Sequence, residues 1–122
     1  MNVRELSVPI VWALLVAGLH ALPVGNLGGS DWLRAVHADK LAHFLMFSVL
    51  GTAVLVAACK AEAWEGKRWL FLVLVAAYGV LLEGSQALWF ATRSAELADA
   101  IADVAGASVA WPLFRGIYQR WP

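Results

Sequence analysis

Four long apolar stretches, separated by short polar segments, limit what this chain can fold into. They cover residues 6–22, 41–59, 69–90 and 97–114, and a helix needs about 20 apolar residues to cross the hydrocarbon core of a bilayer. The chain is 61% hydrophobic and 15% charged, whereas a soluble domain has about 25% charged residues. We therefore predict an all-α integral membrane bundle of four transmembrane helices, forming a single domain over residues 1–122.

The first apolar stretch has two interpretations. A charged start before an apolar core is also typical of a signal peptide. Pro9 and Trp12 lie inside this stretch, however, and no Ala-x-Ala cleavage pattern follows it. These features favour a retained transmembrane helix.

The placement of basic residues predicts the orientation of the bundle. Cytoplasmic segments of membrane proteins carry an excess of Lys and Arg. If the amino terminus is cytoplasmic, the inner segments hold Arg4, Lys60, Lys67, Arg68, Arg115 and Arg120, and the outer segments hold Arg34, Lys40 and Arg93. This bias predicts that both termini are cytoplasmic.

Strongly polar residues occur in or beside the last three apolar stretches, and this topology places them in the outer half of the membrane. They are Asp39, Lys40, His43, Glu83, Gln86, Arg93, Asp99 and Asp103. A lone charge at the bilayer centre costs about 2.5–3.5 kcal/mol on insertion scales, so these side chains should face one another or a wet cavity. We predict that they form a polar pocket. Gly106 and Ala110 continue the face of Asp99 and Asp103, and their small side chains favour close helix packing.

The order and spacing of these residues resemble the VanZ-like family of small bacterial membrane proteins, which is associated with teicoplanin resistance. The family pattern is Asp-Lys-x-x-His-Phe, then Glu-x-x-Gln in a later helix, an Arg, and Asp-x-x-x-Asn-x-x-Gly. The matching positions are Asp39, Lys40, His43, Phe44, Glu83, Gln86, Arg93, Asp99 and Gly106. The chain departs from the pattern at Asp103, which accepts the hydrogen bonds of an Asn but donates one only when protonated.

The resemblance extends from residue 39 to about residue 110. It implies a four-helix, multi-pass protein of the bacterial cytoplasmic (inner) membrane with a role in the cell envelope and a link to antibiotic resistance. It implies no settled reaction, so we assign no catalytic residue and favour a protein that is not an enzyme.

Three functions are compatible with the polar residues. In the favoured one, the outer pocket binds a lipid-linked envelope precursor or a glycopeptide-like molecule, with Lys40 and Arg93 contacting its anionic group. The second is an intramembrane enzyme acting on such a precursor, with His43 as general acid or base and a carboxylate as its partner. The third is a proton-coupled transporter or flippase that works as a homo-oligomer.

Structural and metal-binding roles are the remaining interpretations. In the structural interpretation, His43 serves the fold by hydrogen-bonding to a neighbour such as Glu83 or Asp99. A divalent metal bound by His43 and the carboxylates is a lesser alternative, because the group holds one His and no Cys. We therefore predict no metal and no cofactor. The formal net charge of zero argues against nucleic acid, and membrane lipid is the expected surrounding partner.

Overall fold

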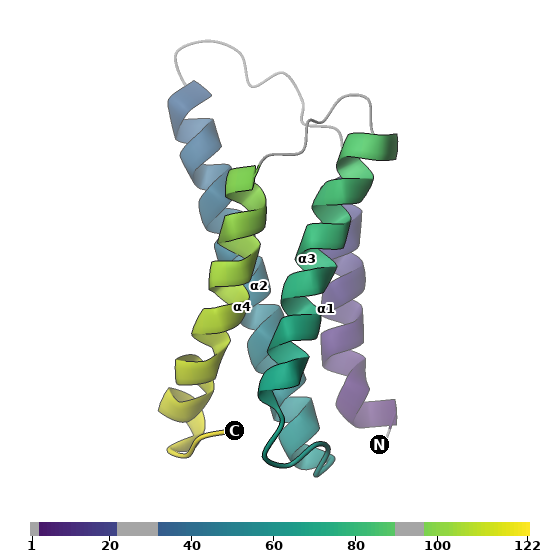
Figure 1. Ribbon diagram of the computed structural model, residues 1–122, viewed down its shortest axis with the longest axis vertical. Helices are drawn as coiled ribbons and strands as arrows, with labels where there is room; N and C mark the ends of the chain where they lie inside the picture. Colours follow the sequence, from purple (N-terminus) through teal and green to yellow (C-terminus); the bar gives the residue numbers. More distant parts are fainter. Residues whose placement is uncertain (1–2, 22–31, 90–96) are drawn as a thin grey trace.

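The computed structural model describes residues 3–21, 32–89 and 97–122, and over these residues the chain is entirely helical. Four helices and no strand are present in this part of the chain, which confirms the all-α prediction. The helices are α1 (Val3–Ala21), α2 (Trp32–Lys60), α3 (Trp69–Trp89) and α4 (Leu97–Tyr118). Figure 1 shows them side by side in an elongated bundle, with the start of α1 and the end of α4 at the same end.

Two of the four helices are long and apolar enough to cross a membrane over the residues described, rather than all four as predicted. They are α2, over Lys40–Lys60, and α4, over Leu97–Tyr118. In α3 the apolar part that is described, Trp69–Ser85, is shorter than a full span. In α1 the charged residues Arg4 and Glu5 occupy the first turn.

The helix that carries the Asp-Lys-x-x-His-Phe motif extends beyond the predicted span. The candidate span in α2, Lys40–Lys60, agrees with the predicted 41–59, but the helix itself is continuous from Trp32. No Gly or Pro occurs between residues 32 and 40, so nothing in that segment stops the helix. Lys40 consequently lies about two turns inside α2.

Helices α2 and α4 are in close contact through small residues. A Cβ at Gly106 would collide with the carbonyl oxygen of Phe44, and a Cβ at Gly51 would lie 2.7 Å from the Cβ of Ala110. The structure thus places Gly106 and Ala110 at the α2–α4 interface. The two helices run in the same direction (Figure 1), so successive contacts between them involve increasing residue numbers in both helices.

Helix α1 is joined to the rest of the bundle by two hydrogen bonds from aromatic side chains. The indole Nε1 of Trp12 donates to the carbonyl oxygen of Met46 at 2.9 Å, and the hydroxyl of Tyr78 donates to that of Ala13 at 2.6 Å. Buried apolar side chains pack around these contacts and include Val16, Phe47, Leu50, Val75 and Ala107. Helix α1 is therefore held against both α2 and α3.

The outside of the bundle is apolar, like its core, and the interior also holds ionisable side chains. Large apolar side chains are exposed on every helix; they include Val8, Leu45, Leu81 and Ile101. Several ionisable side chains are instead buried: His43, Glu83, Asp99 and Asp103. Soluble monomers rarely expose such a large apolar area, and they rarely bury charged groups unless these are paired.

Candidate functional site

Three ionisable side chains from three helices meet inside the bundle. His43 comes from α2, Glu83 from α3 and Asp103 from α4, and we call them the polar cluster. Nδ1 of His43 lies 2.8 Å from Oδ1 of Asp103 and 3.6 Å from Oε1 of Glu83. The exposed fractions of the three residues are 3%, 4% and 0%. Helices α2, α3 and α4 therefore each contribute one ionisable side chain to the same buried site.

The close approach of α3 to the cluster depends on Gly79. A Cβ there would lie 2.8 Å from the Cβ of Asp103 and 2.9 Å from Cε1 of Phe47. Gly79 and Glu83 are four residues apart and share one helix face. The missing side chain at position 79 thus brings the backbone of α3 against Asp103, one turn away from the point where Glu83 joins the cluster.

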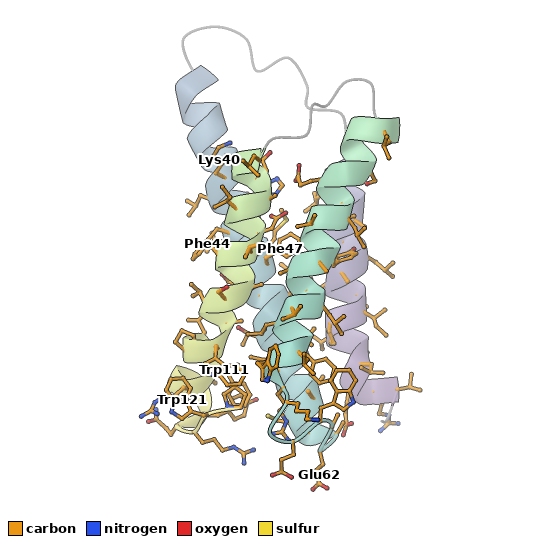
Figure 2. The ribbon with its side chains drawn as sticks, in the orientation of Figure 1. Lys40, Phe44, Phe47, Glu62, Trp111 and Trp121 are labelled. Carbon is orange, nitrogen blue, oxygen red and sulfur yellow. The ribbon has the colours of Figure 1, made fainter. Side chains whose placement is uncertain are left out.

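A second polar contact joins α2 and α4 one helical turn away from the polar cluster, toward the end of the bundle where Figure 2 labels Lys40. Nζ of Lys40 donates to Oδ1 of Asp99 at 3.1 Å. The side chain of Lys40 is 28% exposed and that of Asp99 is 10% exposed. Lys40 precedes His43 by three residues and Asp99 precedes Asp103 by four, so the two contacts are successive links between parallel helices.

The short contact between His43 and Asp103 holds one proton between nitrogen and oxygen. Either Nδ1 of the imidazole donates to the carboxylate, or a protonated carboxyl donates to Nδ1. Both partners are buried, where an unpaired charge is costly and a paired one is tolerated. The arrangement therefore fixes the orientation of the imidazole ring and places its nitrogen between two carboxyl groups.

Five of the eight predicted pocket residues come together in the structure as these two linked groups. His43 makes its short contact with Asp103 at 2.8 Å and lies 3.6 Å from Glu83, which is one of the two acids that the structural interpretation of the sequence named. Asp99 lies in the first turn of α4, as a capping acid would, and pairs with Lys40. Three residues cannot be assigned a place in the pocket. The side chains of Asp39 and Gln86, and the whole of Arg93, lie outside the described residues.

Two hollows lined by described residues lie away from the polar cluster, and no sequence pattern indicated them. An apolar cavity of about 290 Å³ lies between α1, α2 and α3, lined by residues such as Pro9, Val54 and Tyr78. A groove of about 850 Å³ lies between α1, α2 and α4, with Arg4 and Lys60 among its lining residues. Both form where helices diverge, which depends on packing rather than on any local motif.

Metal-ligating atoms in the polar cluster are close enough to share an ion. One nitrogen of His43 and one carboxylate oxygen each of Glu83 and Asp103 lie within 4.8 Å of one another. The metal-binding alternative predicted from the sequence also included Asp99, which pairs with Lys40 instead.

No family model, curated protein or solved structure matches the chain significantly.

Proposed function

We propose that this chain is a multi-pass membrane protein in which all four helices cross the bilayer. The support is the apolar outside of the bundle, together with the ionisable groups buried within its core. Exposed apolar side chains such as Leu81, Leu88 and Leu97 are unfavourable in water and compatible with lipid. Close packing of α2 against α4 through Gly51 and Gly106 is also the type of contact that holds membrane helices together.

We propose that both termini are cytoplasmic and that the membrane is the bacterial inner membrane. Aromatic and basic residues gather at the termini end, opposite Lys40, as Figure 2 shows for Trp111 and Trp121. The guanidinium of Arg115 lies 4.5 Å from the ring centre of Trp121. Trp is enriched at both interfaces of membrane proteins, whereas an excess of Lys and Arg marks the cytoplasmic one. The motifs that resemble the VanZ-like family support the bacterial envelope setting.

The function that we propose is binding, without catalysis, of a lipid-linked envelope precursor or glycopeptide-like molecule, in a role linked to antibiotic tolerance. The observation that carries this proposal is the Lys40–Asp99 pair. Asp99 holds the ammonium of Lys40 at 3.1 Å while leaving that side chain partly exposed above the buried cluster. An ammonium held in place at the edge of a membrane is suited to a phosphate or carboxylate group. Arg93, in the segment before α4, would add a second cation.

An intramembrane enzyme is the second candidate, and the contact between His43 and Asp103 favours it. General acid–base catalysis needs a His within hydrogen-bond reach of an orienting group, and the distance here is 2.8 Å. In this candidate Asp103 orients the imidazole, and His43 transfers the proton to or from a lipid-linked substrate.

Native mass spectrometry of the detergent-purified protein, with identification of bound lipids, tests the binding proposal. We expect a phosphate-bearing lipid on the wild type and its loss in Lys40→Ala. Lys67→Ala is the matched control, because Lys67 is exposed in the connection at the opposite end of the bundle. Equal lipid retention in all three proteins would refute a headgroup site at Lys40. The same spectra report the number of chains, and so test a homo-oligomer.

Turnover separates the two candidates. The wild type and His43→Gln are incubated with a polyprenyl-phosphate-linked lipid, and the products are analysed by mass spectrometry. A binder leaves the lipid unchanged in both proteins. Conversion by the wild type, with binding but no conversion by His43→Gln, would establish the enzyme in place of the binder.

A further inference from the structure

We infer that His43, Glu83 and Asp103 form a binding site for a divalent transition-metal ion. This inference is independent of the lipid proposal, because it concerns the buried cluster rather than the exposed ammonium of Lys40. Its basis is that three metal-ligating side chains from three helices place one ligand atom each within 4.8 Å of one another. The ion would connect α2, α3 and α4 at one point.

The spacing of the ligand atoms is close to that around a small metal ion. A tetrahedral ion with bonds of about 2.1 Å holds its ligands about 3.4 Å apart. Nδ1 of His43 lies 2.8 Å from the oxygen of Asp103 and 3.6 Å from that of Glu83, so the two distances bracket this value. Binding would require a sub-ångström separation of His43 from Asp103 and release of the proton that they share.

The kind of ligand atom indicates the class of metal. One imidazole nitrogen with two carboxylate oxygens suits Zn²⁺, Mn²⁺ and Fe²⁺, whereas Ca²⁺ and Mg²⁺ prefer oxygen ligands alone. Three protein ligands leave at least one coordination position for water or for another molecule. The site therefore has the ligand number of a metal centre that can exchange a ligand.

Charge balance also favours a dication. Two ionised carboxylates that share a buried site repel each other, and the repulsion is relieved by a proton or by a cation. A dication with the carboxylates of Glu83 and Asp103 and the neutral imidazole of His43 is an uncharged assembly. Such an assembly is much cheaper to bury between helices than an uncompensated charge.

The surroundings give the cluster a defined boundary. On one side Gly79 exposes only backbone, and a Cβ there would lie 3.0 Å from Oδ2 of Asp103. On the side of the Lys40 end, Asp99 is engaged with Lys40. Asp99 is thus not a fourth ligand, and it serves as the internal control for an acid on the same face of α4.

Zinc titration of the metal-stripped protein in detergent, followed by calorimetry, tests the inference. We expect one Zn²⁺ per chain in the wild type, and an affinity at least tenfold lower in Asp103→Asn, Glu83→Gln and His43→Gln. Asp99→Asn should bind as the wild type does within about twofold. Less than stoichiometric binding by the wild type, or equal affinities in all variants, would overturn the site.

Thermal unfolding keeps the test valid if a cluster variant fails to fold. Zinc that binds the folded state raises the melting temperature by mass action. We expect a Zn²⁺-dependent rise in the wild type and in Asp99→Asn. A wild type whose melting temperature does not respond to Zn²⁺ would mean that the cluster is a hydrogen-bonded brace between helices and not a metal site.

Discussion

The contact between Gly106 and the backbone of α2 makes the sharpest prediction about stability. In Gly106→Ala the new Cβ would collide with the carbonyl oxygen of Phe44 and lie 3.1 Å from the Cβ of Phe47. The first neighbour is backbone and cannot rotate away, so α2 and α4 must separate. Overpacking of this kind costs about 1–3 kcal/mol. We expect this steric cost to exceed the gain from replacing a helical Gly and so to lower the free energy of unfolding of Gly106→Ala.

Gly116 provides the matched control on the same helix. A Cβ at Gly116 meets nothing within 4 Å, so Gly116→Ala adds no contact. Replacing Gly by Ala inside a helix stabilises it by about 0.5–1 kcal/mol, because Gly loses more backbone entropy on folding. Gly106→Ala receives the same entropic gain, so the two variants should differ by the steric cost alone, about 1–3 kcal/mol, which is roughly a factor of five to more than a hundred in the unfolding constant.

Reversible unfolding in mixed detergent micelles, followed by circular dichroism, measures this difference. Both variants replace Gly by Ala in α4, so effects of composition and of detergent binding cancel. A Gly106→Ala protein as stable as the wild type would refute the close α2–α4 packing. A Gly116→Ala protein that loses as much stability as Gly106→Ala would show that the cost is not steric.

Three further predictions concern the attachment of α1, the topology and the metal site. Tyr78→Phe removes the hydroxyl that donates to Ala13, and we expect a loss of about 0.6–2 kcal/mol in the same unfolding assay; an unchanged stability would contradict this hydrogen bond. A membrane-impermeant maleimide should label Cys59 from the cytoplasmic side only. In a Cys59→Ala background it should label Leu97→Cys from the outer side only, because the two positions lie near opposite ends of the bundle. The reverse pattern would invert the proposed orientation. Gly79→Ala places a methyl group against Asp103, and we expect it to weaken Zn²⁺ binding in calorimetry although all three ligands remain. An unchanged affinity would show that the close approach of α3 does not shape the site.

Local sequence patterns were sufficient to predict the helices, but not all of their limits. Apolar runs and their interruption by Gly, Pro and polar residues predicted four helices. The predicted span over residues 41–59 agrees with the candidate span Lys40–Lys60, but α2 begins at Trp32, because a membrane span follows hydrophobicity whereas a helix continues until something breaks it. Residues 32–40 are polar enough to end an apolar run, yet they contain no breaker. A helix and its membrane-spanning part are therefore separate predictions.

The composition of the site was easier to predict than its pairing. Helical periodicity places Lys40 with His43, and Asp99 with Asp103, on shared faces. Which acid each base meets depends on the axial offset between α2 and α4, and that offset is set by contacts such as Gly106 against Phe44. The role of Gly79 could not be predicted from the sequence either, because the role of a Gly inside a helix depends on which side chain of a neighbouring helix lies against it.

Asp103 links the sequence pattern to the chemistry of the site. As a helix cap it is unexplained, because it lies a full turn beyond Asp99, and in the structure it is fully buried against His43. An amide at this position would also form a hydrogen bond with the imidazole, but it would bring no charge. A carboxylate adds a negative charge beside Glu83, and that charge must be balanced by a proton or a cation. The choice of Asp over Asn at this position therefore favours a cluster that exchanges ions over one that only braces the helices.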